Sequence, residues 1–162
     1  MMTHRGRWRR LRISVTVVSD TRTLKTDRSG KLITEILRSA GHEVMYGGII
    51  GNMREEIRRS IEDAVERGVE VGVFCGGTGV GRRDLTVDTL AEVCEKEVNG
   101  FGEAFRSYSM REIGPFGMLS RAYMGIYRRV VLVALPGSPH AIETATKILI
   151  PVLCHVVEEV RR

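Results

Sequence analysis

Apolar residues along the chain form short runs typical of buried strands, separated by longer stretches that have the spacing of a helix. Residues 11–18, LRISVTVV, are β-branched and mostly apolar, and they predict a first strand that ends near Val18. Residues 43–50, 69–74 and 130–135 have the same character and predict three further strands. Several of these runs are apolar at successive positions, so the strands must be covered on both faces of their sheet.

Between the strands, apolar residues recur every three or four positions, as on a helix with one buried face. These stripes predict helices within residues 32–40, 57–65, 90–94, 101–113 and 142–160. Gly41 and Gly68 are natural stops for the first two, and Asn52 is a natural N-cap for the second. Residues 114–129 predict a loop with a short strand.

The last predicted helix carries its own start signal and an internal breaker. Ser138 and Pro139 are residue types favoured at the N-cap and in the first turn. Pro151 should bend or split this helix, because proline has no N–H to donate. Strands and helices alternate along the chain, which predicts an α/β fold: a three-layer α/β/α sandwich with a mainly parallel sheet.

A chain of 162 residues is long enough to form one domain with a sizeable core. Its three cysteines are far apart and form no C-x-x-C, so we expect neither a disulfide framework nor a zinc site. We expect no apolar stretch long enough to cross a bilayer, and therefore no membrane partner. No secretory segment follows the basic sequence MMTHRGRWRR, so we expect a cytoplasmic protein.

The net charge is +5, and arginines near the N-terminus supply much of the excess. We expect residues 1–10 to form a basic tail and residues 11–162 to form the single domain. The tail is either a solvated segment or an arm used in oligomer contacts. Because no nucleic-acid-binding motif accompanies the arginines, we do not expect a nucleic acid partner. A basic protein also suits polyanionic substrates.

Small and hydroxyl-bearing residues follow three of the predicted strands, where a sheet of parallel strands binds its ligands. They are Ser19, Asp20, Gly76, Gly77, Thr78, Gly79, Pro136, Gly137, Ser138 and Pro139. Because the carboxyl ends of parallel strands meet at one edge, we expect the three loops to lie together there.

The stretch FCGGTGVGRRDLT, residues 74–86, is the clearest candidate site. Glycine lets the main chain approach a ligand closely, and successive free N–H groups form an anion cradle. A plain tight turn is the alternative for the glycines alone, but Arg82, Arg83 and Asp84 favour phosphate binding. A carboxylate beside a phosphate cradle indicates a divalent cation, Mg²⁺. The stretch has no lysine, so it is not a Walker A loop, and it lacks the Rossmann fingerprint.

Five segments of the chain resemble signature segments of the MoaB/MogA family of molybdenum cofactor biosynthesis. They are SDTRTLKTDRSGKLI, GGTGVGRRDLT, GFGEAFR, MLSRA and LPGSPHA. The resemblance covers nearly the whole chain in order, from about Arg12 to the last helix. It implies a molybdopterin-binding domain of three layers, assembled as a homotrimer or homohexamer.

The resemblance also implies an activity. Enzymes of the family transfer AMP from ATP to the terminal phosphate of molybdopterin, release pyrophosphate and require Mg²⁺. By its place in the motif, Asp84 corresponds to the catalytic aspartate and to a metal-positioning residue. Residues 76–79 would cradle phosphate, and residues 136–139 with Ser19 and Asp20 would line the nucleotide and pterin clefts. Ser120 and Arg121 match a loop near the substrate.

One segment departs from the family pattern. Enzymes of the family often have a second acidic residue where this chain has Asn52, in IIGNMREEI. Asn52 is then either a weaker oxygen ligand for Mg²⁺ or a helix cap. Two alternatives to the enzyme follow: a catalytically idle molybdopterin-binding or scaffolding paralogue, and a relative that uses the domain on another nucleotide-containing substrate, as competence-damage-type proteins do.

Overall fold

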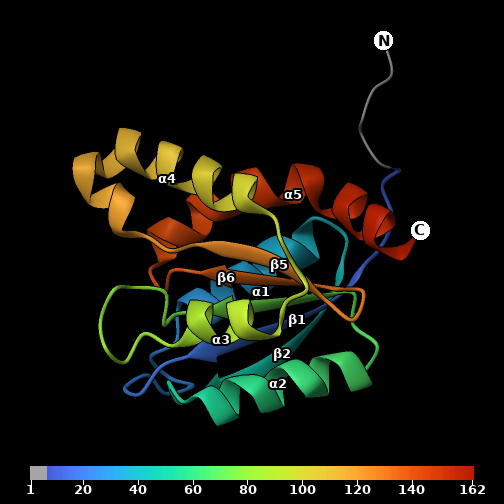
Figure 1. Ribbon diagram of the computed structural model, residues 1–162, viewed down its shortest axis with the longest axis horizontal. Helices are drawn as coiled ribbons and strands as arrows, with labels where there is room; N and C mark the ends of the chain where they lie inside the picture. The colour runs from blue at the N-terminus through green and yellow to red at the C-terminus, as the bar shows by residue number, and fades with distance from the viewer. Residues whose placement is uncertain (1–6) are drawn as a thin grey trace.

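Six strands form one sheet in the order β2-β1-β3-β6-β5-β4 in the computed structural model, which describes residues 7–162 (Figure 1). The strands are β1 (Arg12–Val18), β2 (Glu43–Ile50), β3 (Val71–Cys75), β4 (Lys96–Glu97), β5 (Tyr123–Tyr127) and β6 (Val130–Leu135). β1, β2, β3 and β6 are parallel, whereas β5 runs antiparallel to both β6 and β4. The prediction of a mainly parallel sheet is confirmed.

Helices cover both faces of the sheet, which gives the predicted three layers (Figure 1). They are α1 (Ser29–Ser39), α2 (Arg54–Glu66), α3 (Thr86–Val93), α4 (Asn99–Ile113), the 3₁₀ helix η1 (Gly114–Leu119) and α5 (Pro139–Arg161). α1 and α4 both contact α5 on one face, and α2 contacts α3 on the other. The central strands are therefore shielded on both sides.

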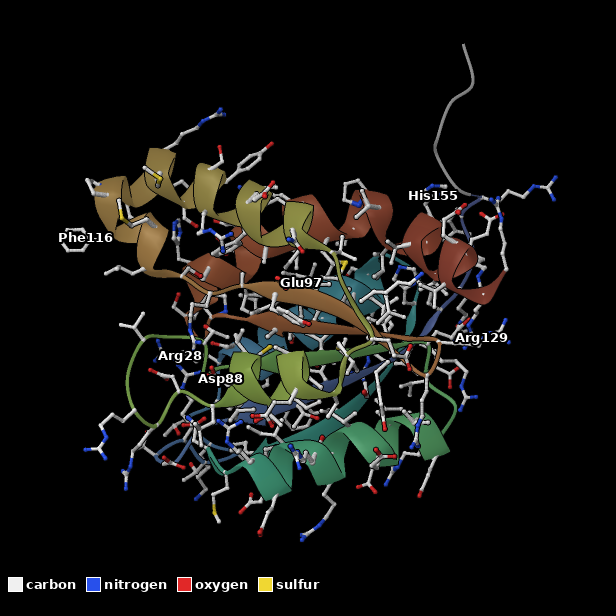
Figure 2. All side chains as sticks on the ribbon, viewed as in Figure 1. Arg28, Asp88, Glu97, Phe116, Arg129 and His155 are labelled. Atoms are coloured by element: carbon white, nitrogen blue, oxygen red, sulfur yellow. The ribbon has the colours of Figure 1, made fainter. Side chains whose placement is uncertain are left out.

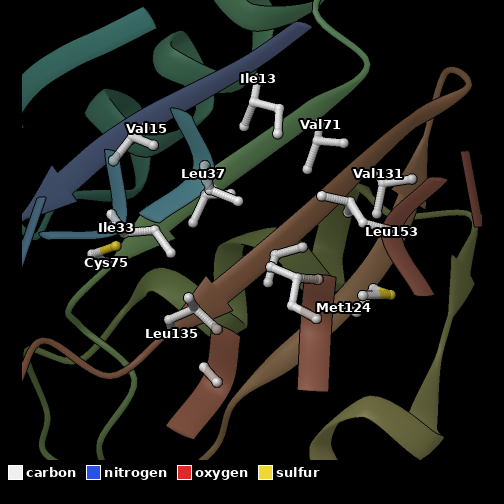
Figure 3. Packing of buried hydrophobic residues seen from close by; sticks show 14 of the residues in the cluster. Ile13, Val15, Ile33, Leu37, Val71, Cys75, Met124, Val131, Leu135 and Leu153 are labelled. Carbon is white, nitrogen blue, oxygen red and sulfur yellow. The ribbon is translucent and has the colours of Figure 1, made fainter. Parts of the chain in front are cut away.

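Alternate residues of each central strand enter two separate cores. Val71, Val73 and Cys75 of β3 pack towards α1, α4 and α5, whereas Phe74 packs towards α2 and α3. Figure 3 shows the first core, in which Ile33 and Leu37 of α1 meet the strand residues. Burial on both faces explains why the strands read as continuous apolar runs.

Three features differ from the sequence-based expectations. The two-residue strand β4 has exposed residues and no apolar pattern, so nothing in the sequence indicated it. Pro151 lies inside α5 without splitting it: the helix is continuous, and the proline is on its exposed side. α5 is also long and apolar enough to cross a membrane by length and composition alone, contrary to expectation. Its Leu149 and Leu153 are buried in the first core, as in the core helix of a globular domain.

Glu70, just before β3, joins the two ends of the described chain. Its side chain is 7% exposed and accepts from the guanidinium of Arg9, and one oxygen lies 3.3 Å from Nη1 of Arg161. The other oxygen accepts from the main-chain N–H of Arg12 at 3.0 Å. Residues 7–10 of the expected tail thus include a contact with the domain, and residues 1–6 lie outside the described part.

Candidate functional site

Three loops meet at one edge of the sheet because β1, β3 and β6 are parallel neighbours. The loop after β1 begins at Ser19, the loop after β3 at Gly76, and the loop after β6 at Pro136. The expected grouping of small residues at a single edge follows from this topology. In Figure 2, Arg28 and Asp88 lie on this side of the molecule, whereas Arg129 and His155 lie at the far end.

Gly76 stands where these loops approach one another most closely. Its N–H donates to the carbonyl of Leu135 at 2.9 Å, which carries the pairing of β3 and β6 beyond the last strand residue. Its φ is 104°, and a Cβ at this position would overlap the carbonyl oxygen of Val18. The loop after β6 also passes close to Gly76, since a Cβ added at Gly137 would lie 3.4 Å from the Gly76 Cα. Only glycine satisfies both the dihedral angle and the space at position 76.

The next residues carry unused main-chain donors. Within residues 7–162, the N–H groups of Gly77, Thr78 and Gly79 donate to no protein acceptor. The start of α3 holds the base of this loop: Thr86 donates its hydroxyl to the carbonyl of Gly76 at 2.8 Å and its N–H to the carbonyl of Gly77 at 3.0 Å. Free N–H groups on a fixed loop are the donors that bind phosphate oxygens.

Asp84 folds back over the same loop. One carboxylate oxygen, Oδ2, accepts from the N–H of Gly81 at 2.9 Å, and a Cβ at Gly79 would stand 2.7 Å from that oxygen. The glycines therefore make room for the carboxylate. Arg82 and Arg83, directly before Asp84, are exposed. A negative group and two positive groups thus occur on one short loop.

Asn52 connects two of the loops instead of capping a helix. Its side-chain Oδ1 accepts from the N–H of Leu85 at 3.3 Å, and its own N–H donates to Asp20 Oδ1 at 2.8 Å. α2 starts at Arg54 with Met53 at the N-cap position, so the helix-cap interpretation is wrong. Asn52 precedes the N-cap residue by one position, and its side chain instead contacts the loop after β3.

The loop after β6 is tied to α1 by Arg22 and Ser29, which lie in the segment SDTRTLKTDRSGKLI but had no role assigned to them from the sequence. Arg22 Nη1 donates to the hydroxyl of Ser29 at 3.2 Å, and this hydroxyl donates to the carbonyl of Gly137. Ser19 accepts from the N–H of Arg22 at 3.0 Å, within its own loop. Asp27 could have indicated from the sequence where α1 begins, because aspartate is favoured just before a helix. In the structure, its Oδ1 accepts from the N–H of Gly30, in the first turn of α1, at 2.9 Å.

Ser138 and Pro139 start α5 as predicted, since the Ser138 hydroxyl accepts from the N–H of Ala141 at 3.2 Å. Beside them is a cavity of about 160 Å³ whose lining includes Phe105, Ser120 and Pro136. The Ser120 hydroxyl is buried and has no hydrogen-bond partner within residues 7–162. A mostly apolar hollow with one unused hydroxyl suits part of an organic ligand.

Arg121 lies beside residues 78–84, which we call the glycine loop. Its Nε donates to the carbonyl of Gly79 at 2.9 Å, and its guanidinium pairs with Asp88 of α3 at 2.9 Å. The hydrogen bonds from Arg121 hold the pKa of Asp88 below its usual range. The pair therefore remains ionised at any pH near neutrality.

Cys75, the last residue of β3, is close to the site, but its thiol is unreactive. The side chain is fully buried, and burial raises the pKa of its thiol to about 12, with the nearby Asp27 carboxylate adding to the effect. A thiol with such a pKa is protonated at neutral pH and is no nucleophile.

Metal binding has a limited donor set here. No group of three or more His, Cys, Asp or Glu side chains that could hold a metal occurs within residues 7–162. The side-chain oxygens at this edge include those of Asp84, Asp20 and Asn52, and the Glu56 carboxylate lies close to Asp20, where it accepts from the N–H of Gly51 at 2.7 Å. Mg²⁺ commonly takes one or two carboxylates and completes its shell with substrate phosphates and water, so these residues fit that ion only together with a phosphate ligand.

Comparison with known proteins connects this arrangement to one group. The family described as "Probable molybdopterin binding domain" matches residues 14–155. The chain is 38% identical to Molybdenum cofactor biosynthesis protein B of Bacillus cereus, over 94% of this chain and 92% of the relative. It is 37% identical to a "Probable molybdopterin adenylyltransferase" of Methanocaldococcus jannaschii, over 96% and 97% of the two chains.

A solved structure of the tungsten cofactor synthesizing protein MoaB from Pyrococcus furiosus has the same fold. Its TM-score is 0.88 at 33% identity, and the match covers 96% of this chain and 100% of that one.

The crowding at Gly76 makes a stability prediction with a matched control. Gly76→Ala should destabilise the protein more than Gly48→Ala, because Gly48 also has a positive φ, 88°, but has no atom within 4 Å of an added Cβ. Both variants bear about 1 kcal/mol for the left-handed backbone, and the overlap with Val18 should add about 1–3 kcal/mol for Gly76 alone. Urea unfolding curves give the two free energies. Equal losses would mean that the loops can move apart without cost.

Proposed function

The chain belongs to the family described as probable molybdopterin-binding domains, and from this premise we propose that it transfers AMP from ATP to the terminal phosphate of molybdopterin. An oxygen of the pterin phosphate attacks the α-phosphorus of ATP. The bond from that phosphorus to the β-phosphate oxygen breaks, its electron pair stays on that oxygen, and pyrophosphate leaves. One observation carries this proposal: three unused N–H groups follow β3 at the carboxyl edge of a parallel sheet, on a loop whose Gly79 lies against the Asp84 carboxylate.

Phosphate groups are the ligands that this loop suits best. The N–H groups of Gly77, Thr78 and Gly79 would bind phosphate oxygens, and Gly76 would provide the sharp turn that presents them. Arg82 and Arg83 are exposed on the same loop and would offset the repulsion between two anionic substrates. The transfer then depends mainly on positioning and on neutralising charge.

The organic parts of the substrates would lie on either side of this loop. The cavity beside Ser120, Pro136 and Ser138 is mostly apolar and would take one flat ring system. Gly137 and Pro139 belong to the same loop as Pro136 and Ser138 and would contact the substrate beside the cavity, and Ser19 and Asp20, on the loop after β1, would contact its other part. The free hydroxyl of Ser120 would donate or accept one orienting hydrogen bond.

Asp84 would hold Mg²⁺ together with the substrate phosphates, and Asp20 and Asn52 are the nearby oxygen donors. Bound there, the ion would supply charge neutralisation at the reacting phosphates. The main chain of Asn52 is fixed by Asp20, and its side-chain oxygen is fixed by Leu85, so it is preorganised whether or not it contacts the metal.

A homo-oligomer is part of the proposal. Between residues 108 and 119, the end of α4 and η1 expose the large apolar side chains of Tyr108, Met110, Ile113, Phe116, Met118 and Leu119, of which Ile113 and Phe116 also line the cavity. Phe116 is 75% exposed and points away from the ribbon at the end of α4 in Figure 2. Apolar patches of this kind are seldom left bare on a monomer, so a second copy would cover this one.

Incubation with ATP, Mg²⁺ and molybdopterin tests the reaction, with pyrophosphate and adenylylated molybdopterin as the two products measured. Both should form in equal amounts. Binding of molybdopterin without pyrophosphate would instead identify an idle binding protein.

In the same assay, Asp84→Asn keeps the size of the side chain and removes its charge. Turnover should fall by on the order of 100-fold, as when one preorganised charge at a reacting group is lost. Molybdopterin affinity should change little. Asp63→Asn, an exposed residue of α2, is the matched control and should have no effect. An Asp84→Asn protein that is folded and fully active would exclude Asp84 from the mechanism.

Asn52→Asp adds one charge at a position of nearly the same size. If this side chain faces the bound cation, the Mg²⁺ concentration for half-maximal turnover should fall, because a carboxylate attracts the ion. If it faces phosphate without a cation, turnover should weaken through repulsion. The hydrogen bond from Leu85 is kept in either case, since aspartate is also an acceptor. An unchanged Mg²⁺ midpoint would mean that Asn52 only joins the loops.

Light scattering tests assembly. The wild-type protein should have the mass of a trimer or hexamer at micromolar concentration, and Met118→Asp, which changes the patch outside the cavity lining, should lower that mass by placing a charge in the interface. Leu24→Asp is the control, because Leu24 is 62% exposed but lies outside the patch. A wild-type monomer would contradict the proposal.

A further inference from the structure

We propose that Arg121 is a positioning residue that fastens the glycine loop, residues 78–84, to the body of the protein and thereby sets the place of Asp84. The loop hydrogen bonds carry the inference, and only its kinetic consequence rests on the proposed function.

The side chain and the main-chain N–H of Arg121 both donate hydrogen bonds to the loop. Arg121 N–H donates to the carbonyl of Thr78 at 3.3 Å, and Arg121 Nε donates to the carbonyl of Gly79 at 2.9 Å. Arg121 Nη2 donates to the carbonyl of Asp84 at 3.1 Å. The remaining hydrogen bonds within 78–84, among residues 7–162, are those between Gly81 and Asp84. Every hydrogen bond from this loop to the rest of the described chain therefore comes from Arg121.

The loop needs such a fastening because of its composition. Residues 78–84 include two glycines and no side chain in the core other than that of Thr78, and Val80 is 71% exposed. Glycine loses more backbone entropy on ordering than any other residue, so a loop of this kind is held only by bonds from outside. The local turn from Gly81 to Asp84 fixes the shape of the tip but not its place.

Asp88 fixes the direction of the arginine. Its two carboxylate oxygens accept from Nη1 at 3.2 Å and from Nη2 at 2.9 Å, which is the planar, two-pronged geometry that guanidinium favours. Asp88 belongs to the first turn of α3, so the arginine is oriented by a helix and not by another mobile loop. Both side chains are more than a third exposed, and the pair serves geometry more than stability.

The same contacts argue against Arg121 as a main phosphate ligand. A guanidinium has five N–H donors, and four of them are used by Gly79, Asp84 and Asp88. One donor of Nη1 is left for a substrate. Phosphate binding through two prongs would require the pair with Asp88 to open.

The rate of tryptic cleavage after Arg82 and Arg83 measures how firmly the glycine loop is held, and the measurement needs no substrate. Both arginines are exposed on the loop, so cleavage there reports its opening. Arg121→Lys keeps the positive charge but cannot reach both carbonyls and Asp88 at once. Cleavage at these two sites, followed by mass spectrometry, should become about tenfold faster, the effect of losing one or two net hydrogen bonds.

Two further variants make the test specific. Asp88→Asn leaves a side chain of the same size and should speed cleavage in the same direction by less, and its effect should not add to that of Arg121→Lys. Arg58→Lys is the matched control, because Arg58 also pairs with an exposed carboxylate, that of Glu92 at 2.6 Å, and among the described residues makes no hydrogen bond to the loop. Its cleavage rate should equal that of the wild type. Unchanged cleavage in both Arg121→Lys and Asp88→Asn would overturn the proposal.

The kinetic readout separates positioning from substrate contact. If Arg121 positions Asp84, Arg121→Lys should lower kcat by about tenfold or more and leave KM for ATP nearly unchanged. If it binds phosphate directly, KM should rise while the cleavage rate stays that of the wild type, which contradicts the proposal. Should the wild-type protein form no pyrophosphate, the proposed function fails, and the cleavage rates still decide the role of Arg121.

Discussion

The site depends on one steric constraint, the absence of a side chain at Gly76. Three parallel strands end together there, and the main chain of β3 passes so close to Val18 that a Cβ would collide with its carbonyl. The hydrogen bond from Gly76 to Leu135 holds the third strand end in the same crossing. The loops after β1, β3 and β6 therefore begin at defined positions, and these positions determine which groups of the loops can face a ligand. The sheet brings the start of each loop to one edge, and contacts within the loops, such as the hydrogen bond from Gly81 to Asp84, then set their shape.

Side chains from outside the glycine loop hold its parts in order. Thr86 holds the base, Asn52 holds the residue after Asp84, and Arg121 holds the stretch between. These three residues come from α3, from the loop after β2 and from the segment before β5. A loop rich in glycine can thus be open to a ligand and still have a defined shape. The cost of ordering it is met by neighbours whose own positions are set by helices and strands.

Much of the fold followed from the sequence because its signals are local or periodic. The apolar runs of β1, β3 and β6 predicted the parallel sheet, and the small residues after them predicted that three loops would meet at one edge. Contacts between distant segments could not be predicted in this way. Asn52 is of a residue type favoured at helix caps, yet its side chain accepts a hydrogen bond from Leu85, 33 residues away in the chain. Arg121 was assigned to the substrate from a motif, and its engagement with Asp88 requires the approach of β5 to α3. β4 has two exposed residues and leaves no periodic trace.

Glu70 has a practical consequence for how the chain can be rearranged. It holds Arg9 and Arg161, the two ends of the domain, within reach of a single carboxylate. The site, by contrast, stands at the carboxyl ends of the strands, whereas Glu70 precedes β3 at the opposite edge of the sheet. A short linker between Arg9 and Arg161, with new termini opened elsewhere on the surface, would give a circular permutant in which the edge that carries the candidate site is undisturbed.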